Sequence, residues 1–285
     1  MSNIVVSPHN LSTMAGIEIL RQGGNAIDAA IATNIVQGVV APETCGIGGD
    51  LFALIWINGE TKPFCLDSSG YAGSNVDISS LSSYSDIPLD HPMSVTVPGA
   101  VRGWYAMHER FGSLEINHLF RQAIEICTKG FEVSTELHQS LKNHEETLKI
   151  QDSGKELYPS GQAPDVGDTI QRTLLANTLE SISLEGPDYF YTGEVNEAIS
   201  EALLNTITKD DISSFNSQWI EPLSIEMYGK IGWVTPPHTQ SYLTLATLKI
   251  YEILDGDSKD IDLHTLIESY RAAASQRDDI TYDYG

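Results

Sequence analysis

The segment LFALIWINGETKPFCLD, residues 51–67, constrains the fold more than any other part of the sequence. The apolar run at 51–57 has the length and composition of a buried strand. Asn58-Gly59 follows it, and this dipeptide is the strongest short signal for a tight turn between antiparallel strands. Residues 62–67 then return as a second strand. The sequence therefore predicts an antiparallel hairpin over 51–67.

A glycine cluster, CGIGGD at residues 45–50, comes directly before this hairpin. Loops that bind phosphate follow a strand and open a helix, whose first amide groups contact the anion. Here the order is helix, glycines, strand. We therefore expect Gly46, Gly48 and Gly49 to permit a close-packed entry into the strand, and not to hold a phosphate.

Hydrophobic periodicity and capping residues predict a helical protein around this hairpin. Ser12 is a plausible N-cap for a helix over 12–22, and Asn25 for a helix over 26–40. The second helix is apolar on nearly all sides, so it should be buried, with Asp28 in a structural hydrogen bond or salt bridge. Further helices are expected at about 100–111, 114–130, 134–150, 172–186, 196–206, 242–254 and 263–277. Two strands should flank Gly229, residues 188–195 read as a turn, and 73–93 and 157–171 as loops.

Composition excludes several classes of partner. A formal net charge of -23 repels nucleic acids and anionic lipid surfaces, so neither is expected as a partner. No apolar stretch approaches the roughly 20 residues of a membrane helix, and no signal segment opens the chain. Three cysteines without a C-x-x-C pair favour buried free thiols in a reducing compartment, and hence a cytoplasmic protein. The histidines are scattered, so no metal site and no cofactor is expected.

Six motifs in order resemble the N-terminal, large-subunit region of the γ-glutamyltransferase family. They are GGNAIDAAIAT, APETCGIGGDLFAL, VTVPGAVRGW, the block LYPSGQAPDVGDTIQRTLLANTLESISLEGPDYFYTGEV, EPLSIEMYGKIGWVTPP and HTLIESYRAAASQRD. The resemblance covers essentially the whole chain. It implies that residues 1–285 form a single domain, the N-terminal part of a precursor.

The resemblance also implies a fold and a mechanism. The fold is α+β, of the N-terminal-nucleophile hydrolase type: two antiparallel sheets stacked in an αββα sandwich, incomplete in this portion. Precursors of the family cleave themselves, and the new N-terminal threonine of the small subunit attacks an amide carbonyl. That threonine is expected beyond Gly285, so no residue of this chain is assigned as catalytic. We expect the chain to be inactive without its C-terminal small subunit, and to be either a fragment or a truncated gene.

Two departures from the family pattern concern the substrate. The family's D-F-R-E segment, whose arginine holds the α-carboxylate of a γ-glutamyl donor, is matched by Asp67, Ser68, Ser69 and Gly70. The family's Pro-Pro-Ser-Ser-Gly-Gly is matched by Pro-Pro-His-Thr-Gln-Ser. Both departures resemble the acylase and oxamate-amidohydrolase branch, which predicts hydrolysis of a small amide. The residues expected to contact the substrate are Asp67, Ser68, Ser69, His238, Thr239 and Gln240.

Alternatives remain at this point. Arg102 is a substitute carboxylate anchor or a structural ion pair, and Ser68-Ser69 also reads as an ordinary turn. The chain also fits a true glutathione hydrolase or γ-glutamyl transpeptidase. A third reading, from another class, is a non-catalytic remnant that binds a partner or a small ligand. The sequence leaves open the substrate, the balance of hydrolysis and transfer, autoprocessing and the oligomeric state.

Overall fold

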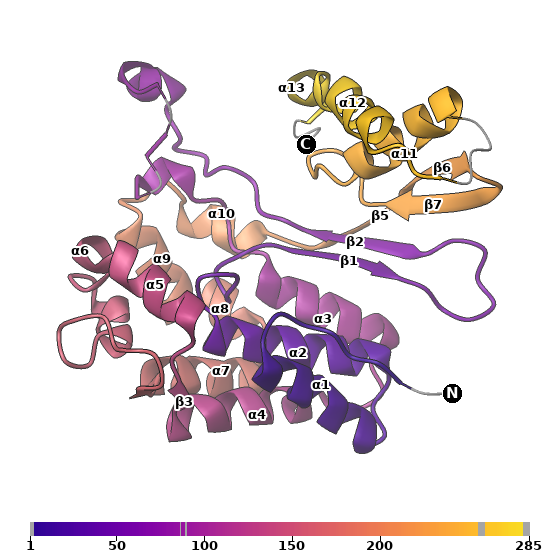
Figure 1. Ribbon diagram of the computed structural model, residues 1–285. Coiled ribbons are helices and arrows are strands. Elements are labelled where there is room, and N and C mark those ends of the chain that lie inside the picture. The colour runs from indigo at the N-terminus through magenta and orange to yellow at the C-terminus, as the bar shows by residue number, and fades with distance from the viewer. Residues whose placement is uncertain (1–2, 86, 89, 256–259, 282–285) are drawn as a thin grey trace. The chain divides into compact units, whose positions relative to one another are not determined.

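A computed structural model describes residues 3–85, 87–88, 90–255 and 260–281 (Figure 1). By their internal contacts, the described residues divide into two compact units. The larger unit comprises residues 3–51 and 68–217, and the smaller unit comprises residues 52–67 and 218–281. The single domain expected over residues 1–285 stays a prediction.

The larger unit is mainly helical. Its α-helices are α1 (Asn10–Arg21), α2 (Ala26–Val40), α3 (Ala100–Phe111), α4 (Ile116–Lys129), α5 (Thr135–Asn143), α6 (Glu145–Leu148), α7 (Thr173–Glu185), α8 (Asp188–Thr192), α9 (Glu194–Ala202) and α10 (Lys209–Ser214). It also contains the 3-10 helices η1 (Ile78–Ser83), η2 (Pro92–Ser94) and η3 (Asp152–Leu157), and the short antiparallel pair β3 (Phe131–Glu132) and β4 (Thr169–Ile170).

Helix α2 lies at the centre of this unit and packs against α1, α3 and α4 (Figure 1). Asn25 and Asp28 form a capping box at its start, in which each side chain accepts a hydrogen bond from the backbone of the other. Asp28 is fully buried and also accepts hydrogen bonds from the Ser113 backbone and hydroxyl. At the other end, the half-buried Arg172 donates to the carbonyls of Gly38 and Val39, which the helix leaves unpaired. The predicted buried helix and the structural role of Asp28 are confirmed.

Several local predictions in the larger unit are wrong. The single helix expected over 134–150 is interrupted at His144 and forms α5 and α6. Helix α1 begins at Asn10, with the His9 imidazole accepting from the Leu11 amide; Ser12 lies inside the helix, where its hydroxyl donates to the His9 carbonyl. Residues 188–192, expected as a turn, form the short helix α8, because Phe190 and Tyr191 are at most 1% exposed and the core holds them.

The smaller unit contains most of the strand residues. A three-stranded sheet has the order β1 (Leu51–Ile55), β2 (Phe64–Ser68) and β5 (Gln218–Ile220), in which β1 begins and β2 ends at a residue of the larger unit. The Glu60 amide donates to the Ile57 carbonyl around Asn58-Gly59, and Gly59 has a φ of 94°. A left-handed residue at this position of the turn favours glycine. The predicted hairpin is confirmed.

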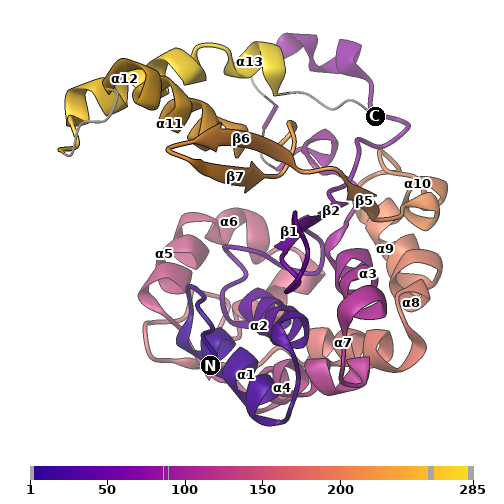
Figure 2. The ribbon, with the colours of Figure 1, turned by 90° about the vertical axis from the view of Figure 1, so that its right-hand side faces the viewer.

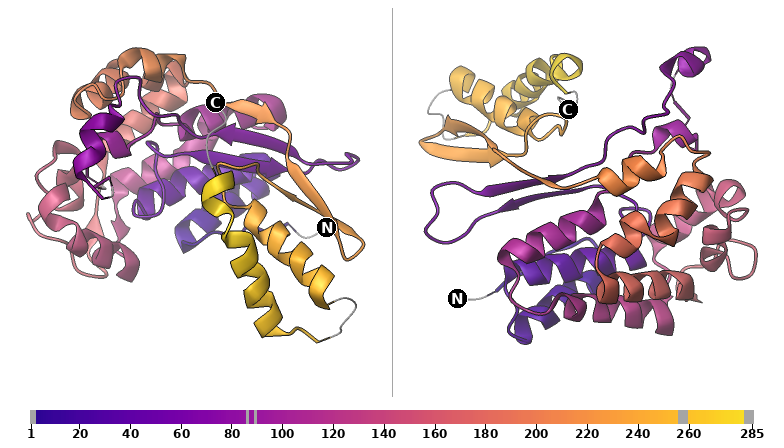
Figure 3. Two further views of the ribbon diagram at one scale, coloured as in Figure 1. Left: turned by 90° about the horizontal axis from the view of Figure 1, so that it is seen from above. Right: turned by 180° about the vertical axis from the view of Figure 1, so that it is seen from behind.

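A second sheet and three helices complete the smaller unit. Strands β6 (Leu223–Met227) and β7 (Lys230–Val234) pair antiparallel around Gly229, as predicted. Helix α11 (Tyr242–Asp255) packs on both strands (Figure 2). Helix α12 (Leu263–Ala274) lies beside α11, as Figure 3 shows from two further sides, and the short α13 (Arg277–Ile280) follows. No helix among the described residues combines the length and the apolar character needed to cross a bilayer.

Candidate functional site

Asp67 and His238, both predicted to contact the substrate, meet in the smaller unit. Strand β2 carries Asp67 opposite Gln218 of β5, and His238 follows β7 after Pro236-Pro237. Asp67 Oδ2 lies 3.1 Å from His238 Nε2, and the two side chains are 15% and 28% exposed. The Phe52 ring lies 5.4 Å from the imidazole. The carboxylate therefore fixes the orientation of a partly exposed imidazole.

Thr239 and Gln240 have different surroundings. The Thr239 hydroxyl lies 2.7 Å from the hydroxyls of both Thr235 and Ser241, and it donates to the Pro236 carbonyl. This cluster holds the turn that leads into α11. The Gln240 side chain is exposed, while its carbonyl accepts from the Leu243 amide. Sequence reasoning missed Thr235 and Ser241, although hydroxyl residues around Pro-Pro are a recognised turn signal.

Ser68 and Ser69 belong to the larger unit. The Ser68 side chain is fully buried: its hydroxyl donates to the Gly99 carbonyl at 2.7 Å and lies 2.7 Å from the Ser217 hydroxyl. Its own carbonyl would lie 1.9 Å from a Cβ at Gly99, so only glycine fits there. Ser68 therefore has a structural role at the start of α3. Ser69 is half-buried, and contact of either serine with substrate stays a prediction.

The backbone near these serines explains the glycine cluster. The Gly49 carbonyl accepts hydrogen bonds from the Gly99 and Ala100 amides, so the start of α3 is capped by the chain itself and does not present these amides to a phosphate. An added Cβ at Gly46 or Gly48 would meet nothing within 4 Å, but a Cβ at Gly38 would lie 3.1 Å from the Gly46 Cα, so the expected close packing is found at Gly46 through Gly38 and not at Gly48. Asp50, which the sequence reasoning also missed, accepts from the Gly70 amide at 3.0 Å.

Arg102, considered as a substitute carboxylate anchor, has structural partners. Its guanidinium lies 3.1 Å from Asp188 Oδ1 and 4.5 Å from the centre of the Tyr191 ring. The Tyr191 hydroxyl in turn donates to the Pro98 carbonyl, and burial raises the pKa of Tyr191 far above its ordinary value. These contacts support the structural ion-pair alternative.

Burial also raises the pKa values of the Cys65 and Cys127 thiols. All three are free, and Cys65 and Cys127 are at most 1% exposed. Burial raises the pKa of Cys65 to about 11, with a further contribution from the nearby Asp67 charge, and that of Cys127 to about 12. Neither thiol is therefore prepared for nucleophilic chemistry. In the described part of the chain, no three His, Cys, Asp or Glu residues gather as a metal site would require.

Helices, antiparallel sheets and a strand-end carboxylate–imidazole pair define an α+β protein with a candidate polar site. The sequence profile described as Gamma-glutamyltranspeptidase matches residues 12–284, and the chain belongs to this family. It is 32% identical over 290 residues to the glutathione hydrolase-like YwrD proenzyme of Bacillus subtilis, covering 98% of this chain and 55% of the relative. To the oxamate amidohydrolase proenzyme of Klebsiella pneumoniae it is 31% identical over 287 residues, covering 96% of this chain and 54% of the relative.

Among solved structures, the gamma-glutamyltranspeptidase of Helicobacter pylori superposes with a TM-score of 0.88 at 27% identity, covering 98% of this chain and 84% of that one. The predicted family and the predicted α+β fold with antiparallel sheets are thereby confirmed. The chain spans about half the length of the curated relatives it matches.

Proposed function

We propose that this chain forms the large-subunit part of an amide hydrolase or acyltransferase that acts through an N-terminal threonine on a small subunit of the same precursor. The family membership and the proenzyme names of the two relatives support this proposal. The threonine hydroxyl would attack the amide carbonyl, its own α-amine would take the hydroxyl proton and pass it to the departing amine, and the amide C–N bond would break to leave an acyl-threonine ester. Water or a second amine would then attack this ester, take the acyl group and restore the hydroxyl.

The acyl donor in this proposal is a small amide whose acid part is not held by a guanidinium. The observation that carries it is the pairing of Asp67 with His238 at 3.1 Å, next to the segment where the family resemblance places an arginine. At that segment this chain has Ser68 and Ser69, and Ser68 is buried against Gly99. A serine hydroxyl does not neutralise a carboxylate, which disfavours a γ-glutamyl donor.

His238 is the residue to which we assign recognition of the acid part. Asp67 fixes the orientation of the ring at 3.1 Å, and an imidazole is a side chain that hydrogen-bonds to carboxylates and amide oxygens. Phe52 supports one side of the ring. Thr239 and Ser241 fix the turn that carries His238, so their effect on the substrate is indirect.

The test compares hydrolysis of oxamate and of a γ-glutamyl anilide by the processed two-subunit protein. We expect oxamate or another small amide to be the better substrate, and residues 1–285 alone to be inactive. His238→Gln should raise KM by about tenfold or more, the usual cost of one hydrogen bond to a charged group, with little change in kcat. His264→Gln, an exposed histidine at the start of α12, is the matched control.

Three outcomes would contradict parts of this proposal. Fast γ-glutamyl transfer to dipeptides would favour the true transpeptidase alternative. Amide turnover by residues 1–285 alone would contradict a nucleophile on the small subunit. A protein that never yields two subunits and hydrolyses no amide would favour a non-catalytic remnant that binds a partner or ligand.

A further inference from the structure

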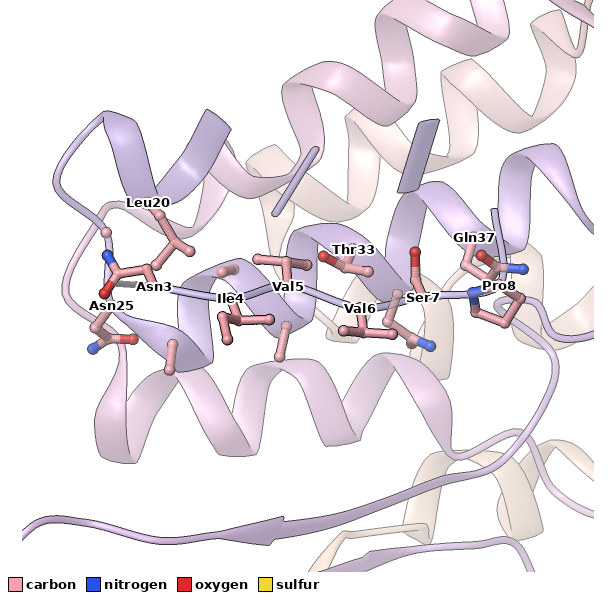
Figure 4. A pocket seen from close by; sticks show the side chains of 15 residues that line it. Asn3, Ile4, Val5, Val6, Ser7, Pro8, Leu20, Asn25, Thr33 and Gln37 are labelled. Carbon is pink, nitrogen blue, oxygen red and sulfur yellow. The ribbon is translucent and has the colours of Figure 1, made fainter. Parts of the chain in front are cut away.

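The N-terminal segment Asn3–Pro8 runs extended along α1 and α2 and borders a groove (Figure 4). Alternate side chains point to opposite sides of the segment. Val5 packs inward, where its Cγ1 would lie 2.8 Å from a Cβ at Gly16, and the Ser7 hydroxyl bonds those of Ser12 and Thr13. The segment is therefore held on the helices by its inward side chains.

The outward side and the backbone of this segment are uncovered. The side chains of Ile4 and Val6 are 82% and 86% exposed. Within the described part of the chain, the amides and carbonyls of residues 3–6 take part in no backbone hydrogen bond. An extended segment with free backbone groups and exposed apolar side chains is an open edge for another strand.

The groove beside the segment has a volume of 690 Å³. Its floor carries small side chains of α2, among them Ala26, Ala29 and Ala30. None of the fifteen residues that line it is charged, in a chain of net charge -23. The buried Thr33 hydroxyl at the groove has no hydrogen-bond partner among the described residues. The absence of charge in the lining therefore suits an uncharged segment and disfavours an ionic ligand.

We propose that a strand of the small subunit pairs with Asn3–Ser7 and places alternate apolar side chains over this groove. This inference rests on the proposed function, which supplies the small subunit. The curated relatives extend to about twice the span that this chain matches, so a partner segment of sufficient length exists in proteins of this family. The free backbone edge favours a strand over a small apolar ligand, because a ligand would leave the amides and carbonyls unpaired.

Hydrogen exchange of the processed two-subunit protein tests the pairing directly. Alternate amides, either those of residues 4 and 6 or those of residues 5 and 7, should exchange about 100-fold more slowly than the intrinsic rates for their sequence, because only every second amide of a strand faces a given partner. A benzophenone side chain at position 4 should crosslink to the small subunit. The same group at position 184, where Leu184 of α7 is 72% exposed in the same unit, should not.

Each other outcome has a definite meaning. Unprotected amides with a co-purifying small subunit would overturn the inference and leave the proposed function intact. Crosslinking from position 4 to a second copy of this chain would also overturn it. Displacement of a groove-bound apolar dye without amide protection would favour a small ligand. Complete absence of a small subunit would contradict the proposed function itself.

Discussion

In the larger unit Trp104, Phe120 and Tyr191 are at most 2% exposed, whereas in the smaller unit Trp56, Ile231 and Tyr270 are each more than half exposed. The contrast extends along whole elements of the smaller unit, whose exposed apolar residues include Leu223, Ile253, Leu254, Leu263 and Ile267. The larger unit closes a core of its own. The smaller unit shows apolar surface of the kind that proteins usually cover with a partner.

The two units also differ in whether their polar contacts stabilise the fold or form a candidate site. The residues that hold the larger unit, such as Asp28 and Arg172, have their partners inside it and form no open site. In the smaller unit, the Asp67–His238 pair lies at strand ends and stays partly exposed. We therefore expect substitutions in the larger unit to change the free energy of unfolding, and substitutions at the pair to change substrate binding.

The largest expected effect compares two tryptophans. Trp104 packs edge-on against Phe120, and its indole N–H donates to Asn34 Oδ1 at 2.7 Å. Trp104→Ala should lower the free energy of unfolding by about 3–5 kcal/mol, because it leaves a large cavity and an unpaired Asn34. Urea unfolding followed by circular dichroism measures this change.

Trp56→Ala is the matched control for this prediction, since Trp56 is 55% exposed in the smaller unit. It should cost less than about 1 kcal/mol. Similar losses for the two variants would show that the smaller unit depends on its apolar side chains as much as the larger one does. That result would break the comparison.

Some features of the fold were predictable from the sequence and others were not. Capping residues and hydrophobic periodicity are local, so α2, the 51–67 hairpin and the pair of strands around Gly229 were predictable. Local patterns cannot show which long-range partner a side chain will meet. Helix α8 depends on the burial of Phe190 and Tyr191, and Ser68 reaches Gly99, 31 residues away. For the same reason, local patterns could not show which side chains would meet at the candidate site.

Asp67 and His238 were each predicted to contact substrate from their positions in family motifs. No pattern indicated that Asp67 would pair with His238, because the contact depends on how β2 and the turn after β7 meet within the smaller unit. Their roles toward a substrate stay predictions, which the His238→Gln comparison addresses.

The expected effect of intermediate size is a difference in the rate at which a buried cysteine of each unit reacts, which depends on how readily that unit opens. Cys127 on α4 and Cys65 on β2 are both buried, and each must become exposed before it reacts with iodoacetamide. Because the smaller unit leaves more of its apolar side chains exposed, we expect it to open more readily, and Cys65 should label at least about tenfold faster than Cys127. Mass spectrometry of single-cysteine variants measures both rates, with the half-buried Cys45 as the fast reference.

The two thiols also differ in pKa, about 11 for Cys65 and about 12 for Cys127 in the folded protein. A difference in labelling rate could therefore come from opening or from the pKa values. Repeating the labelling at low urea concentrations separates these two explanations. Labelling through opening accelerates with urea, whereas a difference due only to the folded-state pKa values would not depend on it. Equal rates, or a ratio reversed in favour of Cys127, would contradict the expected easier opening of the smaller unit.

The smallest expected effect is a pH dependence within the larger unit. Partial burial alone would raise the pKa of Asp211, but hydrogen bonds from the Ser74 and Thr208 amides and hydroxyls lower it below 3.8. The carboxylate joins the 73–76 loop to the start of α10 through Ser74 and its own capping box. Its stabilising contribution is fully present above the unfolded pKa and is lost as pH falls through the folded pKa.

Asp211→Asn should therefore cost about 1 kcal/mol near neutral pH, typical of a lost helix cap, and the cost should shrink as pH falls below 3.8. Thermal unfolding over an acid-to-neutral series measures both effects. Asp210→Asn is the control, because the described residues donate no hydrogen bond to its carboxylate. If the two variants lost the same stability at every pH, the cap would contribute nothing specific, and the stability of the larger unit would rest on its apolar core alone.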